Sequence, residues 1–131
     1  MEKALFLDPH TLQSYTPERF LLHGDLLWNS TGLGTLGRMA IYDERVNPYG
    51  IAVADSHVTV IRTFKEFVSY EYLYYYFSSN EVQSVIEDKA EGSTKQKELS
   101  TKTIKAHLVP LPPIREQQRI VKAIRHLFSK L

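Results

Sequence analysis

Three glycines with the spacing of a nucleotide-binding loop are the first candidate for chemistry in this sequence. Gly32, Gly34 and Gly37 match the pattern G-x-G-x-x-G, and Asp55 follows Gly37 by 18 residues, near the place of a ribose-binding acid. In that motif the glycines open a helix whose amino end faces the pyrophosphate. Residues 38–42 have the pattern of a strand instead, so we expect no dinucleotide site here.

The polar residues around these glycines suit a different ligand. Short hydrogen-bonding side chains and one cation flank the glycines or lie among them: Asn29, Ser30, Thr31, Thr35 and Arg38. Glycine lets a backbone approach a ligand closely. Hydroxyls and amides bind phosphates or base edges, and arginine can donate two hydrogen bonds to a phosphate or a guanine. The residues alone leave two interpretations open, a flexible connection between strands or a loop that approaches DNA.

A second polar segment combines a glycine with hydroxyls and cations. Gly92 is followed by Ser93, Thr94, Lys95, Gln96 and Lys97. Lysines neutralise phosphate charge, and a glutamine in the major groove can bind adenine through two hydrogen bonds. This segment is either a phosphate-facing loop or a solvated connection between helices.

Catalytic and metal-binding patterns are weak. The chain has no cysteine, which excludes a thiol nucleophile, a disulfide framework and a thiolate zinc site. None of the five histidines has the i, i+4 spacing of a helical metal site. Asp55 and His57 share one face of a predicted strand, an arrangement more typical of a structural hydrogen bond than of a triad. We therefore expect no catalytic residue, no metal and no cofactor.

The elements that must hold these residues are predicted in the order strands, helices, final helix. We expect strands within residues 19–29 and over 38–42, 51–54 and 57–62, with a turn at 47–50. A helix rich in tyrosine follows Ser69, a second is capped by Asn80 and stopped by Gly92, and a third runs from Ser100 through Lys105. The aromatic residues of 70–77 lie on nearly all sides of their helix, which favours core packing over base stacking.

The chain closes with a helix that needs a partner. Pro113 is tolerated at a helix start, and Glu116 in the first turn suits the positive end of the helix dipole. An apolar stripe follows at helical spacing: Ile120, Val121, Ile124, Leu127, Phe128 and Leu131. So short a helix cannot bury this stripe alone. The fold class is therefore α+β, a small twisted β-sheet with flanking helices followed by a C-terminal docking, coiled-coil-like helix.

Composition and charge limit the function classes. The 131 residues suit one domain with a modest core, and no apolar run approaches the ~20 residues that span a bilayer. The net charge of +1 supplies no overall basic footprint for DNA. Cations are unevenly placed, however: residues 95–105 carry four lysines and one acid, whereas residues 81–91 carry four acids and one lysine. Such runs are also typical of solvated faces.

Four motifs in a fixed order carry a family resemblance. They are Gly24-Asp25-Leu26-Leu27-Trp28-Asn29 with the glycine loop through Arg38, then 55–62, then 92–96, then Leu111-Pro112-Pro113-Ile114-Arg115-Glu116-Gln117-Gln118-Arg119-Ile120. Together they resemble the specificity subunit of type I restriction–modification systems. The resemblance covers roughly Phe20 to Leu131.

The resemblance implies a non-catalytic module that recognises a DNA sequence while other subunits carry out the chemistry. Residues 1–112 would be a target recognition domain, short at its amino end, and 113–131 the start of a dimerisation or spacer helix. Expected partners are double-stranded DNA, the modification (methyltransferase) subunit and the restriction–translocation subunit in the cytoplasm, with a possible homodimer through the last helix. The family's full subunit has two such domains, so this chain would be a half-subunit or a fragment.

Two alternatives remain. In the first, the chain is a helix-mediated interaction module whose DNA face is degenerate, which the near-neutral charge favours. In the second, it is a small nucleotide-dependent enzyme that uses the glycine loop. DNA recognition predicts one positive face containing Arg38, Lys95 and Lys97, whereas the enzyme predicts a helix opening at Gly32.

Overall fold

A three-stranded antiparallel sheet forms the centre of the computed structural model, which describes residues 15–29, 38–54, 57–89, 91–93, 96–98 and 101–131. The strand order is β2 (Met39–Ile41), β1 (Leu26–Asn29), β3 (Val58–Ile61). In the register, Leu26 lies opposite Ile41 and Ile61. Strand β1 takes the middle position because its residues are apolar on both faces. Two 3-10 turns, η2 (Pro17–Arg19) and η3 (Glu44–Val46), lie before β1 and after β2.

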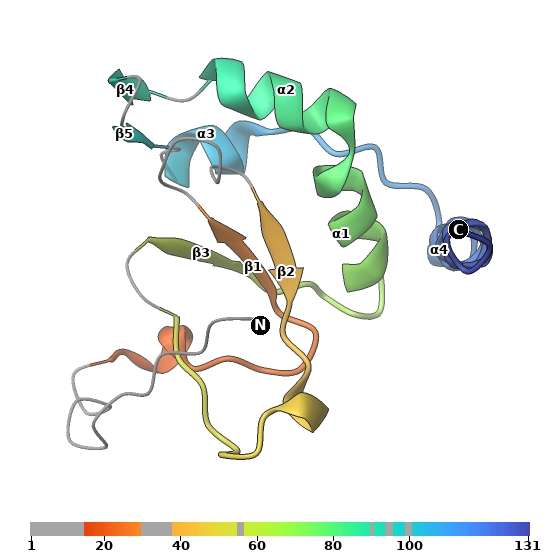
Figure 1. Cartoon of the computed structure of the whole chain (residues 1–131), viewed down its shortest axis with the longest axis horizontal. Helices are drawn as coiled ribbons and strands as arrows, with labels where there is room; N and C mark the ends of the chain where they lie inside the picture. The colour runs from red at the N-terminus through yellow and green to blue at the C-terminus, as the bar shows by residue number, and fades with distance from the viewer. Residues whose placement is uncertain (1–14, 30–37, 55–56, 90, 94–95, 99–100) are drawn as a thin grey trace.

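Helices pack on one face of this sheet (Figure 1). They are α1 (Tyr70–Ser78), α2 (Asn80–Lys89) and α3 (Thr101–Ala106), whereas the fourth helix, α4 (Ile114–Phe128), packs on α1. Helix α1 lies between the sheet and α4, so that α4 is separated from the strands by a whole helix (Figure 1). The α+β class expected from the sequence is confirmed.

The alternation of side chains along β1 divides the core in two. Leu26 and Trp28 point to the helical face, where they pack against Leu73 and Phe77 of α1. The Trp28 and Phe77 rings are 4.6 Å apart between centroids. Leu27 points to the opposite face and packs against a smaller cluster of Leu21, Tyr42 and Ala54. Fully burying side chains of this size stabilises a fold by ~1.5–3 kcal/mol each.

The turn into β1 needs its glycine and its acid. Gly24 has φ +88°, and a Cβ there would lie 2.9 Å from the Tyr70 ring, so another residue would be both strained and crowded. Asp25 is 1% exposed. Its carboxylate accepts hydrogen bonds from Arg62 at 2.7 and 2.8 Å and from the Leu22 backbone N–H at 2.8 Å. Hydrogen bonding to Asp25 raises the pKa of the Arg62 guanidinium.

The tyrosine-rich helix contributes to the core, as the sequence predicted. Tyr72, Leu73 and Phe77 are buried. The Tyr72 hydroxyl donates to the Pro110 carbonyl at 2.6 Å, and Tyr76 contacts the His107 ring nitrogen at 2.9 Å. Burial raises the pKa of the Tyr72 phenol. These phenols hold the extended segment 107–111 along the outside of α1 and lead it to α4.

Three local predictions were wrong. Residues 51–54 form no strand; Val53 makes a single bridge to Phe20, because the facing segment ends at η2 on one side and at a turn on the other. Ser79 rather than Asn80 caps α2, accepting the Val82 N–H at 3.4 Å. Residues 91–93 and 96–98 are not part of a loop but pair as two antiparallel strands, β4 (Glu91–Ser93) and β5 (Gln96–Glu98), so Gly92 is a strand residue. Their polar sequence lacks the apolar alternation that would have indicated strands.

Candidate nucleic-acid interface and helix face

The structure brings Asn29 and Arg38 together at one end of the sheet. Asn29 is the last residue of β1 and is half-buried, and Arg38 directly precedes β2 and is exposed. The Asn29 backbone N–H donates to the Arg38 carbonyl at 2.8 Å. The loop that leaves β1 therefore returns to β2 beside its own start. Ser30, Thr31, Thr35 and the three glycines lie outside the described residues.

A strand, and not a helix, follows the three glycines of the dinucleotide-binding pattern. Residues 39–41 form β2, which pairs with β1. The fingerprint requires a helix at this point, and the structure has the strand that the sequence predicted here.

The second polar segment lies in a hairpin. Ser93 pairs with Gln96, and Gly92 with Lys97. Thr94 and Lys95 are outside the described residues, as are the side chains of Ser93, Gln96 and Lys97. Figure 1 shows β4 and β5 on the side of the molecule away from α4. The predicted positive face of Arg38, Lys95 and Lys97 therefore stays a prediction.

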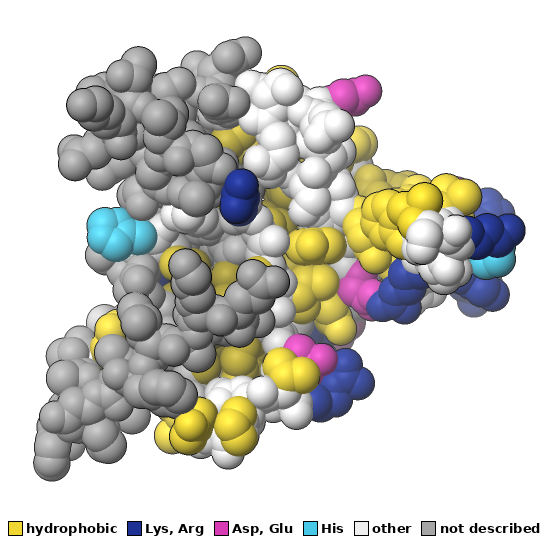
Figure 2. Space-filling view, viewed as in Figure 1, with side chains coloured by type: hydrophobic (Ala, Val, Ile, Leu, Met, Phe, Trp, Pro, Cys, Tyr) yellow, Lys and Arg dark blue, Asp and Glu magenta, His cyan; other side chains and the backbone are white. Residues whose placement is uncertain are grey.

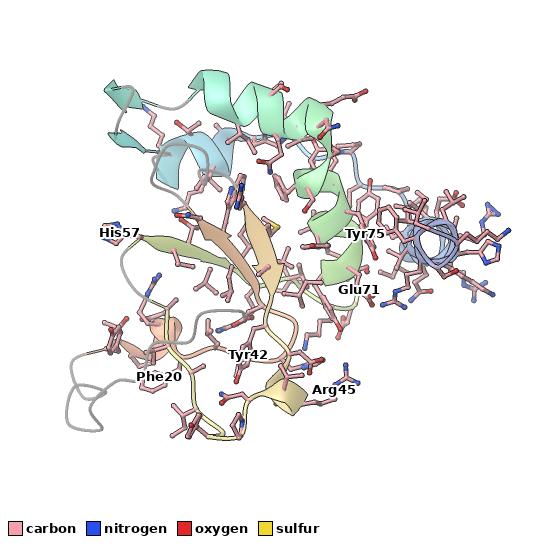
Figure 3. All side chains as sticks on the ribbon, in the orientation of Figure 1. Phe20, Tyr42, Arg45, His57, Glu71 and Tyr75 are labelled. Atoms are coloured by element: carbon pink, nitrogen blue, oxygen red, sulfur yellow. The ribbon has the colours of Figure 1, made fainter. Side chains whose placement is uncertain are left out.

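The sequence reasoning gave His57 only a structural role, yet the structure places it at the same end of the sheet. It directly precedes β3, whose first residue, Val58, pairs with Asn29. The imidazole is exposed and points outward at the tip of β3 (Figure 3). Its spacing from Asn29 in the sequence gave no signal, because only strand pairing makes the two neighbours.

Helix α4 packs on α1 through one edge of its apolar stripe. Val121 is 5% exposed. Arg125 forms an ion pair with Glu71 of α1, and the Phe128 ring lies 6.0 Å from Tyr75 between centroids. Figure 3 shows Glu71 and Tyr75 on the side of α1 that faces α4. Part of the stripe expected to need a partner is therefore covered by the chain's own domain.

The other edge of the stripe passes from half-buried at Ile120 and Ile124 to exposed at Leu127, and is here called the open seam. It consists of Ile120, Ile124 and Leu127, continued after the helix by Leu131. These residues follow one another at intervals of four, three and four, the spacing of a coiled-coil seam. Leu127 is 63% exposed and Leu131 99% exposed, and the apolar surface on α4 is visible in Figure 2. The single partner face predicted from the sequence is thus two faces.

The third side of α4 is basic. Arg115, Arg119, Lys122 and His126 recur at helical spacing and are all exposed. Residues 114–131 carry five cations and one acid, whereas residues 1–113 carry 11 cations and 14 acids. The slight positive charge of the chain therefore comes from this helix and not from the rest.

Among the described residues, no three histidine or acidic side chains are arranged to hold a metal ion. No helix in the same part of the chain is both long and apolar enough to cross a membrane.

The described residues form an α+β domain with an amphipathic helix on its flank. Comparison with known families identifies which one. Residues 11–131 match the type I restriction modification DNA specificity domain, and the chain belongs to this family. It is also 36% identical over 59 residues to the type I restriction enzyme EcoKI specificity subunit of Escherichia coli K12. That match covers 45% of this chain and 13% of the relative.

Proposed function

We propose that this chain is a sequence-specific DNA recognition module, the non-catalytic specificity component of a type I restriction–modification system. Family membership supports this role. The observation that carries it to particular residues is the pairing of Asn29 and Arg38 at the end of the sheet. Both side chains, with the loop between them, would face double-stranded DNA in the cytoplasm. Ser93, Thr94, Lys95, Gln96 and Lys97 of the hairpin region would contact the phosphates or a base edge.

The proposed partners use α4. The open seam would pair with a second helix in a coiled coil, either from another copy of this chain or from a second specificity half. The modification (methyltransferase) subunit and the restriction–translocation subunit would join the resulting assembly. Residues 1–112 would then form the recognition domain and 113–131 the spacer helix.

Selection from a randomised DNA pool in the presence of the modification subunit tests this function. We expect one enriched sequence motif, which is lost when the recognition chain is omitted. Recovery of DNA with no enriched motif would contradict sequence recognition.

Arg38→Ala should lower DNA affinity and relax the preference at one base pair. If the guanidinium forks onto a guanine edge, the loss is ~1–3 kcal/mol for the matched target and smaller for a target changed at that position. Binding to both targets and the melting temperature are measured together. An equal loss on both targets would indicate a phosphate contact, and a lower melting temperature would indicate a role within the fold. A stable variant with unchanged affinity and preference would remove Arg38 from the interface.

Replacing Lys95 and Lys97 by Ala should reduce the salt dependence of non-specific binding. Each neutralised phosphate contributes about 0.9 to the slope of log affinity against log salt, so the slope should flatten by about 2. Lys102→Ala with Lys105→Ala is the matched control from the same lysine-rich segment. An unchanged slope in the Lys95 and Lys97 variant would place the hairpin away from DNA.

A second candidate function is a helix-mediated interaction module with a degenerate DNA face. The observation in its favour is the charge distribution, because residues 1–113 carry more acids than cations and the excess of cations lies on α4. Under this alternative the chain enters the complex through its open seam, and Arg38→Ala leaves the selected DNA motif unchanged.

A further inference from the structure

The buried polar side chain of α4 is unusual in its surroundings. Gln117 is 0% exposed and lies on the side of the helix that faces the domain, one turn before Val121. A buried amide is costly unless its hydrogen-bonding groups are satisfied. A leucine or methionine could fill the same space, so packing does not explain the glutamine. Its hydrogen bonds must account for it.

Three backbone groups from two separate segments meet at this amide. The Ser69 N–H donates to the Gln117 side-chain oxygen at 2.8 Å. The Gln117 side-chain nitrogen donates to the carbonyls of Phe67 at 2.9 Å and Pro112 at 2.8 Å. Ser69 is the N-cap of α1, and Phe67 closes the turn before it. One planar group thus joins the start of α1 to the start of α4.

Glutamine suits this place because it offers an acceptor and two donors. Glutamate would accept from Ser69 but would set a negative charge against two carbonyl oxygens. Methionine would fill the space and leave all three backbone groups without this partner. The other contacts of α4 with α1 include the packing of Val121, the ion pair between Arg125 and Glu71, and ring packing near the far end of the helix.

We propose that Gln117 is the positioning residue that fixes the direction in which α4 leaves the recognition domain. When α4 is held by a partner, this direction sets how the sheet end with Asn29 and Arg38 is presented. That second step rests on the proposed function, whereas the fixed direction does not. Gln117 acts through the backbone at Phe67, Ser69 and Pro112 and touches no ligand.

The test measures the direction of α4 without DNA. The chain has no cysteine, so spin labels can be attached to Glu18→Cys and Lys122→Cys, both at exposed positions. Double electron–electron resonance then gives the distribution of the distance between the two labels. We expect a single narrow peak in the parent chain. Gln117→Met should broaden or shift the peak while the sheet stays folded. Gln118→Met, at the neighbouring exposed position, should leave the peak unchanged.

A charged variant separates positioning from general stability. In Gln117→Glu the two carbonyls and burial raise the pKa of the introduced carboxyl. Its distance distribution should be broad above that pKa and should narrow as the pH falls, because the protonated acid regains one donor. Gln118→Glu should show no such pH dependence. A narrow peak at the parent distance for Gln117→Met and Gln117→Glu at all pH values would overturn the proposal, even if both variants melt at lower temperature.

The parent chain provides a measurement that no folding failure can obscure. If the hydrogen bond from the Ser69 N–H to the Gln117 side chain is present in solution, this N–H should exchange with solvent about tenfold more slowly than an N–H without a hydrogen bond. Such a hydrogen bond contributes up to ~1.5 kcal/mol. Exchange of Ser69 at the rate of an open helix end would overturn the proposal. DNA selection is measured separately, so failure of DNA recognition leaves this result intact, and the reverse also holds.

Discussion

An Arg62→Met variant is expected to lose about 3 kcal/mol of unfolding free energy. Arg62 is the charged partner of Asp25, whose carboxylate is almost fully buried beside β1. Removing one member of a buried pair leaves an uncompensated charge and costs ~3–5 kcal/mol. The lower end of that range applies because the Arg62 side chain is 39% exposed and water can partly replace it. Urea unfolding monitored by Trp28 fluorescence measures the loss.

An exposed ion pair in the same chain provides the control. The Arg45 guanidinium donates one hydrogen bond to each carboxylate oxygen of Asp43, and these bonds lower the pKa of Asp43 to about 2. The Arg45 side chain is 77% exposed (Figure 3). Arg45→Met should therefore lower the free energy of unfolding far less than Arg62→Met does, because water screens an exposed pair. Equal losses in the two variants would show that burial of Asp25 does not govern the stability of this turn.

If two copies of this chain pair through α4, as proposed, Leu127→Glu should weaken that pairing strongly. Leu127 belongs to the open seam and is 63% exposed, so the substitution disturbs the chain's own packing little. Burial of such a side chain contributes ~1.5–3 kcal/mol, and a two-fold symmetric pair buries it twice. The dimer should thus weaken by at least ~100-fold. Sedimentation velocity of the parent chain and the variant measures this.

The matched control adds the same charge to another side of the helix. Gln118 is exposed and lies on the side of α4 opposite the open seam, so Gln118→Glu should sediment like the parent chain. If the parent chain is monomeric at all concentrations, pairing between copies is excluded and the seam must meet a different helix. If Gln118→Glu weakens the dimer as much as Leu127→Glu does, the added charge rather than the seam explains the effect.

Much of the architecture could be predicted from local sequence because local physics decides it. Strands form at the β-branched run of residues 58–61 and at the apolar run of residues 26–28. Helix α4 begins directly after the two prolines at 112–113. Ser69 caps α1 as predicted, since a serine oxygen reaches the N–H three residues on. The hairpin at 91–98 escaped prediction because polar residues in a short two-stranded ladder carry no periodic apolar signal.

The candidate site was predicted less completely. The motif order indicated the family and drew attention to Asn29 and Arg38. It could not indicate that His57 would join them, because that neighbourhood is created by the pairing of β1 with β3. Spacing along a chain carries no information about which strands pair unless a short turn joins them.

The sequence by itself determined that this chain has an amphipathic closing helix, an α+β order of elements and the motifs of its family. Only the tertiary structure decided how the helix is used. In the sequence, the apolar residues of α4 form one continuous stripe. Helical periodicity shows which side of a helix is apolar but not what covers that side. Packing against α1 buries Val121 and brings the Phe128 ring next to Tyr75, whereas Ile120 and Ile124 are half-buried and Leu127 stays exposed. The same packing buried Gln117 among backbone groups some 50 residues away in sequence, a contact that no local pattern encodes.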